Sequence, residues 1–99
     1  MCKLLVGGEL VPGPLGGTTR NPVEDGTWRF PTKGSRREVT ELIVHESVTR
    51  TTKDTLSVLR TRGLSVHLIL GPDGVLSQHG DLLDDVLWHA GPVHNPPSI

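Results

Sequence analysis

The sequence has a single cysteine, no tyrosine and few aromatic residues, which make up 3% of the chain. One cysteine, Cys2, cannot form an internal disulfide, so nothing in the sequence indicates an oxidising compartment. No stretch approaches the roughly 20 apolar residues of a membrane-spanning helix. The apolar run after Lys3 breaks at glycines before it reaches the roughly seven residues that a signal peptide needs. We therefore expect synthesis in the cytoplasm, with no signal peptide and no membrane partner.

The sequence also lacks an excess of either charge. Ten Lys and Arg residues stand against 11 Asp and Glu residues, for a formal net charge of -1. Proteins that bind nucleic acid usually carry a basic face, so we expect no nucleic-acid partner. Arg36 and Arg37 beside Lys33 form a local basic cluster, which we interpret as a solvated turn rather than an anion site. With 34% hydrophobic and 21% charged residues, the composition is that of a soluble globular protein.

What the sequence does contain in quantity is glycine, proline and histidine, at 12, 8 and 5 residues. Many of the turn-forming Gly and Pro pairs lie in residues 1–37, which we interpret as an irregular N-terminal arm with one short strand at Lys3–Val6. Trp28 and Phe30 are expected to hold this arm onto the domain formed by residues 38–99. A chain of 99 residues allows one small domain of limited stability.

Beyond residue 38 the pattern becomes regular. Residues 42–44, Leu-Ile-Val, form a short apolar run rich in β-branched side chains, which predicts a buried central strand. Thr51 followed three residues later by Asp54 is a helix-start signal, and a glycine follows the next apolar-periodic stretch. These signals predict a helix over Thr52–Arg62.

A hairpin and a further strand are predicted after the helix. Residues 65–70 alternate apolar and polar side chains, Gly-Pro-Asp-Gly at 71–74 is a turn sequence, and 75–78 return as the partner strand. Another strand is expected within residues 86–91. The order of elements predicts an α/β fold with a central mixed β-sheet and a flanking helix, incomplete at its C-terminal edge. An exposed sheet edge invites pairing, so self-association is a possible partner interaction.

Four segments carry a family resemblance. An apolar strand is followed by His45 and a nearby hydroxyl residue; residues 66–74 are Val-His-Leu-Ile-Leu-Gly-Pro-Asp-Gly; residues 88–91 are Trp-His-Ala-Gly; and residues 95–99 fit Asn-x-x-Ser-Ile. In this order they resemble motifs of the type-2 N-acetylmuramoyl-L-alanine amidase family, which includes phage T7 lysozyme, AmpD-type amidases and peptidoglycan recognition proteins. Residues 38–99 thus resemble the N-terminal portion of an amidase-type domain.

The resemblance implies a reaction, a cofactor and a partner. In this family Zn²⁺, held by two histidines and a Cys or Asp, activates water to cleave the amide between N-acetylmuramic acid and L-alanine in peptidoglycan. His45 matches the first zinc-binding histidine, and the positions of the other ligands lie beyond Ile99. We therefore expect an incomplete zinc site and little or no catalysis by these 99 residues. The implied partner is peptidoglycan or a muropeptide, and the implied place of action is the cell wall or periplasm.

We expect particular roles for six further residues. Three match the substrate groove, where an aromatic face stacks on a sugar or a stem peptide: Trp88, His89 and Asn95. Three are expected to be structural: His67, Asp73 and Gly74. For His67 we expect a hydrogen bond to a neighbouring backbone carbonyl, and for Trp88 a role as core anchor is an equal alternative.

Other interpretations stay open. Taken alone, His45 also fits a surface histidine at a strand end, and the chain's histidines lack the close spacing of a His-x-x-x-His zinc site. Asp84 and Asp85 are adjacent, and such pairs usually point apart into water, so we assign no acid–base pair. Two further functions are a non-catalytic muropeptide-binding module and a small self-associating α/β domain.

Overall fold

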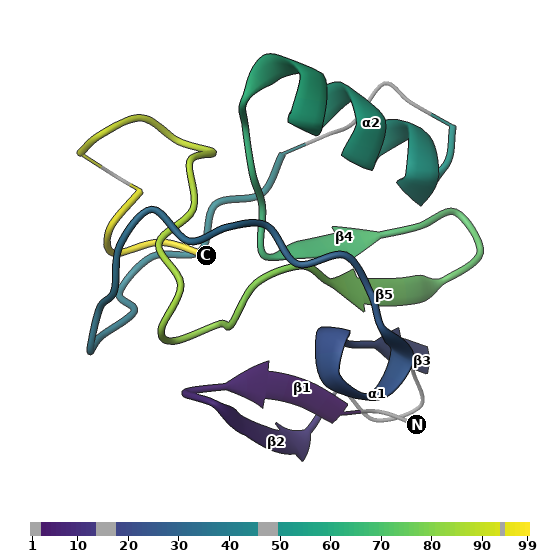
Figure 1. The fold of residues 1–99 in the computed structure, drawn as a ribbon, viewed down its shortest axis with the longest axis horizontal. Coiled ribbons are helices and arrows are strands. Elements are labelled where there is room, and N and C mark those ends of the chain that lie inside the picture. Colours follow the sequence, from purple (N-terminus) through teal and green to yellow (C-terminus); the bar gives the residue numbers. More distant parts are fainter. Residues whose placement is uncertain (1–2, 14–17, 46–49, 94) are drawn as a thin grey trace.

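The computed structural model describes residues 3–13, 18–45, 50–93 and 95–99, which form a mixed α/β fold with two small sheets (Figure 1). The first sheet is an antiparallel hairpin, and the second has three strands in the order β3-β5-β4. Figure 1 shows α2 on one side of the three-stranded sheet and the hairpin on the other. The elements are β1 (Lys3–Val6), β2 (Glu9–Pro12), β3 (Thr18–Arg20), α1 (Pro22–Asp25), α2 (Thr52–Arg62), β4 (Leu68–Leu70) and β5 (Val75–Gln78).

Helix α2 has the bounds that its sequence signals predict. The Thr51 hydroxyl accepts a hydrogen bond from the Asp54 backbone N–H at 3.1 Å, which caps the first turn. At the other end Gly63 adopts the left-handed conformation, with φ of 69°, and the Leu64 N–H bonds the Leu59 carbonyl. No α2 side chain is fully buried, so the helix covers the sheet without forming a closed core with it.

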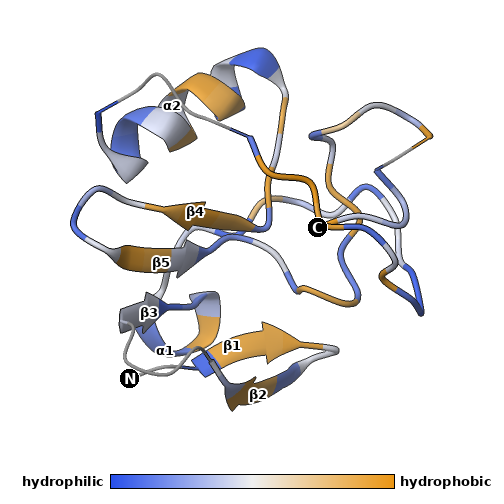
Figure 2. Cartoon of the chain, turned by 180° about the vertical axis from the view of Figure 1, so that it is seen from behind, coloured by the Kyte–Doolittle hydropathy of each residue, from blue (hydrophilic) through white to orange (hydrophobic). Residues whose placement is uncertain are grey.

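The predicted hairpin is also present, as antiparallel strands β4 and β5, although β4 is shorter than expected. Figure 2 shows that β4 and the first half of β5 are hydrophobic. Their turn closes through a hydrogen bond from the Gly74 N–H to the Gly71 carbonyl, and the Asp73 carboxylate accepts from the Val75 N–H at 3.0 Å. Asp73 and Gly74 therefore occupy the turn positions expected of them. Strand β5 pairs with β3 in parallel, so the three-stranded sheet is mixed.

The prediction of a buried central strand at residues 42–44 is wrong. Leu42 and Val44 are 72% and 85% exposed. The partner of this segment is the end of the chain: the Ile43 N–H bonds the Ile99 carbonyl at 3.0 Å. A buried strand needs elements packed on both faces, and here the face that carries Leu42 and Val44 is exposed while Ile43 is half-buried. The strand expected within residues 86–91 is also absent, since that segment is a loop.

The prediction of an irregular N-terminal arm is likewise wrong, although the strand at Lys3–Val6 is confirmed. Gly7 and Gly8 have φ values of 59° and 80°, which a two-residue type I′ hairpin turn requires and glycine permits. They join β1 to β2. Asn21 caps the short helix α1 by accepting two backbone N–H groups, and β3 enters the same sheet as β5. Residues on both sides of position 37 thus contribute to one sheet.

The interior of the described residues is unusually polar. Four hydrophobic side chains are buried, and eleven polar or charged residues are buried with them. Phe30 is among the buried ones, so it anchors its segment as expected, whereas Trp28 remains 44% exposed. A buried polar group costs free energy unless it is hydrogen-bonded. The fold therefore depends on how these polar groups are paired.

Asp81 is the most heavily used of these groups. Its carboxylate accepts four backbone hydrogen bonds: from Gly7 and Gly8 in the β1–β2 turn, each at 2.7 Å, and from Leu83 and Asp84, each at 2.9 Å. Burial by itself would raise the pKa of Asp81, but the four N–H donors outweigh it and lower the pKa below its usual value. The charged carboxylate thus fastens the N-terminal hairpin to the loop after β5.

We predict that Asp81→Asn lowers the free energy of unfolding by about 2 kcal/mol, because an amide NH₂ then faces backbone donors in a buried place. Urea unfolding followed by circular dichroism measures this loss. The neighbouring Asp84 is exposed, and Asp84→Asn should change stability by less than about 0.5 kcal/mol. Equal effects of the two substitutions would contradict the role given to Asp81.

Candidate functional site

Three histidines from separate parts of the chain lie together. The ring centroids of His45 and His89 are 5.7 Å apart, and those of His67 and His89 are 5.9 Å apart. His45 follows the exposed segment 42–44, His67 directly precedes β4, and His89 lies in the loop after residue 85. His89 lies between the other two rings. The wide spacing of the three residues in the sequence does not indicate this grouping.

His67 is buried and electrically neutral. Its Nε2 lies 2.7 Å from the Asp85 carbonyl oxygen, which only accepts, so Nε2 carries the proton and donates. This is the hydrogen bond to a backbone carbonyl that the sequence predicts. Nδ1 then holds a lone pair, and it has no partner within the described residues. Burial lowers the pKa of His67 to about 4, while the Asp85 hydrogen bond opposes the shift and the nearby Arg36 charge adds to it.

His89 is held in place by the segment that ends the chain. Its Nε2 lies 3.1 Å from the Ser98 hydroxyl. The Asn95 amide oxygen accepts hydrogen bonds from the backbone N–H groups of His89 and Ala90, at 3.0 and 2.8 Å. Asn95 is only 6% exposed, and its side chain fixes the His89 backbone. The sequence predicts that Asn95 contacts substrate, but the buried side chain is not exposed for such a contact. Burial lowers the pKa of His89 as well.

Arg36 lies next to His67, with its guanidinium 3.3 Å from the His67 Nε2. Its guanidinium donates to the carbonyls of Leu82 and Leu83 in one loop and to those of Pro96 and Ser98 in another. The interpretation of the basic cluster as a solvated turn is therefore wrong for this residue. Because Arg36 joins the two loops, it also sets where Ser98 meets His89. Nothing in the sequence around Arg36 signals this role.

Trp88 lies beside this group and faces solvent. The side chain is 51% exposed, which does not fit the alternative of a core anchor. Lys33 Nζ lies 4.8 Å from the centre of its ring, a cation–π contact. The Trp88 backbone N–H donates to the Ser65 hydroxyl at 2.9 Å, which fixes the loop at this point. The structure thus presents an aromatic surface with a cation over it.

The carboxylates at residues 84 and 85 point to different surroundings. Asp84 is exposed, as expected. Asp85, by contrast, is buried and accepts two hydrogen bonds from the Arg29 guanidinium, at 3.0 and 3.1 Å. Its expected exposure to water is therefore wrong. Since Asp85 is buried and bound to Arg29 while Asp84 is exposed, we assign them no role as an acid–base pair.

The zinc ion implied by the family resemblance needs three protein ligands. Within the described residues, no group of three or more His, Cys, Asp or Glu side chains is placed to hold a metal ion. The rings of His45 and His67 each meet His89 edge to face, at 86° and 89°, instead of surrounding an ion. These residues by themselves do not fit a complete zinc site.

Comparison with known proteins adds no relative: no family model, curated protein or solved structure matches this chain. Among the described residues, no helix is both long enough and apolar enough to span a membrane.

Because burial lowers the pKa of His67 and His79, we predict that the stability of the fold depends on pH. His67 has a folded-state pKa of about 4, below the roughly 6.5 of an unfolded chain, so its stabilising contribution is complete above pH 6.5 and is lost as the pH falls toward 4. Between pH 7.5 and 5 we expect a loss of about 2 kcal/mol from His67 alone. Burial also lowers the pKa of His79, which adds to the loss in the same direction.

Urea unfolding at the two pH values tests this prediction. The variant His67→Gln cannot titrate and keeps a donor for the Asp85 carbonyl. It should show a smaller drop in stability between pH 7.5 and 5 than the unmodified chain. An identical drop in both proteins would show that the pKa of His67 does not differ between the folded and unfolded states.

Proposed function

We propose that residues 38–99 form part of a zinc-dependent N-acetylmuramoyl-L-alanine amidase domain, with His45 as one zinc ligand. The observation that carries the proposal is the contact between His45 and His89, whose ring centroids are 5.7 Å apart. They belong to two motifs that are distant in the sequence and that resemble the same family. A chance resemblance gives no reason for two such residues to meet at one place on the surface.

The surroundings of this pair suit a peptidoglycan substrate. Trp88 directly precedes His89, and its half-exposed ring offers a face for a sugar ring or a stem peptide. Lys33 lies over that ring and supplies a positive charge for a substrate carboxylate. Ser98 and Asn95 hold the side chain and the backbone of His89, so the loop that carries both residues is positioned before substrate binds.

The reaction is proposed to be hydrolysis of the amide between N-acetylmuramic acid and L-alanine. A bound zinc ion would supply an activated water and would polarise the amide carbonyl. His45 is exposed and therefore accessible to an ion at the surface. Burial lowers the pKa of His89, which favours the neutral form of the ring beside His45. We propose that the remaining zinc ligands belong to sequence outside these 99 residues.

Zinc binding and hydrolysis test this function together. The 99-residue chain should release no stem peptide from a muramoyl tripeptide, measured by liquid chromatography and mass spectrometry. A protein translated from the same gene past Ile99 should bind one Zn²⁺ and release the peptide. In that longer protein, His45→Ala should abolish hydrolysis and weaken zinc binding at least 100-fold. His94→Ala is the matched control, since no motif assigns that histidine to zinc.

Each other outcome points to a different function. Hydrolysis that survives His45→Ala would rule out the proposed ligand. Muropeptide binding without zinc or hydrolysis in the longer protein would identify a non-catalytic binding module. A size that grows with concentration, without muropeptide binding, would identify a self-associating domain that pairs through its sheet edge.

The role of Trp88 gives a separate prediction. Trp88→Ala should weaken muropeptide binding about three- to tenfold, because an aromatic contact contributes roughly 0.5–1.5 kcal/mol. Isothermal titration calorimetry measures the affinity, and the melting temperature should change little since the side chain is half exposed. Val93→Ala, at another exposed apolar position, is the control and should leave the affinity unchanged.

A further inference from the structure

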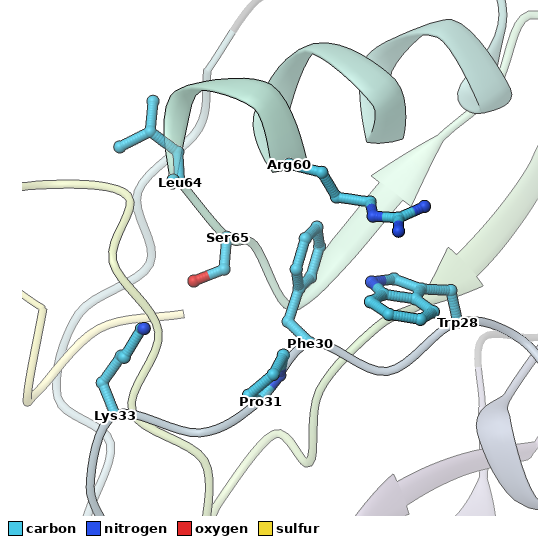
Figure 3. Close-up of a pocket in the computed structure, with 8 residues that line it drawn as sticks. Trp28, Phe30, Pro31, Lys33, Arg60, Leu64 and Ser65 are labelled. Carbon is cyan, nitrogen blue, oxygen red and sulfur yellow. The ribbon is translucent and has the colours of Figure 1, made fainter.

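A pocket separate from the histidine group opens between the C-terminal end of α2 and residues 28–33 (Figure 3). Its volume is about 210 Å³, and neither His45, His67 nor His89 lines it. Lys33 lines this pocket, and its Nζ also lies over the Trp88 ring. The lining residues are Trp28, Phe30, Pro31, Lys33, Arg60, Gly63, Leu64 and Ser65.

The wall that comes from residues 28–31 is apolar and rigidly placed. Phe30 is buried, and its ring meets Trp28 edge to face with centroids 6.5 Å apart. Figure 3 shows the Phe30 ring standing between Arg60 and Ser65, with Pro31 below it. Trp28 stays 44% exposed, so part of its ring is open to a ligand. Such a wall packs against aliphatic or flat groups.

Two positive charges border this apolar wall. The Arg60 guanidinium lies 4.3 Å from the centre of the Trp28 ring, and Lys33 Nζ lies 4.8 Å from that of Trp88. None of the eight lining residues is acidic, and in the part of the chain that the structure describes neither cation forms an ion pair. A guanidinium stacked on a ring keeps its N–H groups directed outward in its own plane, available to a carboxylate.

We propose that this pocket binds a carboxylate-bearing residue of an acidic peptide. The size of the pocket is below the roughly 300 Å³ at which sites for whole small molecules begin, so it accommodates one residue of a longer ligand. The carboxylate pairs with Arg60, whose guanidinium lies over the Trp28 ring, and the aliphatic part of the residue packs on Phe30 and Trp28. The proposal rests on charge complementarity at this pocket and not on amidase activity.

The probe is the peptide acetyl-Ala-Glu-Ala-Ala with free carboxylates, compared with acetyl-Ala-Gln-Ala-Ala-amide, which has the same shape and no charge. Calorimetry on the full 99-residue chain should give at least tenfold tighter binding of the acidic peptide. Its affinity should fall as salt rises from 50 to 300 mM, because exposed charges are screened. Nuclear magnetic resonance should show shifts at the Trp28 indole N–H and at the Gly63 and Leu64 amides.

Two variants on the same helix make the test specific. Arg60→Gln removes a lining charge and should weaken binding of the acidic peptide about tenfold or more, as expected for a charge-assisted hydrogen bond. Arg62→Gln removes an equal charge two residues away that does not line this pocket, and it should change the affinity less than twofold. Both side chains are exposed, so both variants should keep the circular dichroism spectrum of the unmodified chain.

Three results would overturn the proposal. One is equal affinity for the two peptides, which would show that carboxylates are not recognised. Another is an equal loss in Arg60→Gln and Arg62→Gln, which would indicate nonspecific attraction to a basic helix. The third is binding of the acidic peptide with shifts confined to residues that lie away from Trp28 and Gly63.

Discussion

The buried carboxylate of Asp81 is the constraint on which the arrangement of this protein depends. An unpaired buried charge costs several kcal/mol, so the chain must bring donors to it. Two of them are the N–H groups of Gly7 and Gly8, at the tip of the β1–β2 hairpin. The Gln78 side chain adds hydrogen bonds to both backbone groups of Leu5. The N-terminal hairpin is thereby joined through hydrogen bonds to the loop after β5.

The same kind of constraint places the candidate site. Arg36 holds the loop around Leu83 against the segment that ends in Ser98, through four backbone carbonyls. Ser98 then reaches His89, and His89 stands between the other two histidines. Within such a low-dielectric network a satisfied hydrogen bond is strong and an unsatisfied group is costly. Burial in this network lowers the pKa of His67 to about 4, and the partnerless Nδ1 of His67 is an exception within the described residues.

Much of the secondary structure was open to prediction, but unevenly so. Helix α2 and the β4–β5 hairpin were predictable because their caps and turn involve residues only a few positions apart. The β1–β2 hairpin had a signal too, since Gly-Gly between two short apolar runs is typical of a two-residue turn. Residues 42–44 have the composition of a buried strand, yet burial depends on what packs against both faces. The partner of β3 could not be foreseen, because parallel pairing with β5 joins distant residues.

By itself, the sequence determined the elements whose hydrogen bonds close within a turn, and it contained the motif residues that suggest a zinc amidase. Only the tertiary structure decided that His45, His67 and His89 meet, that Asn95 supports the loop from inside, and that Trp88 faces solvent. It also decided the protonation of His67, since that depends on burial and on the distant groups Asp85 and Arg36. Caps and turns are local interactions, whereas burial and electrostatics are sums over groups that only folding brings together.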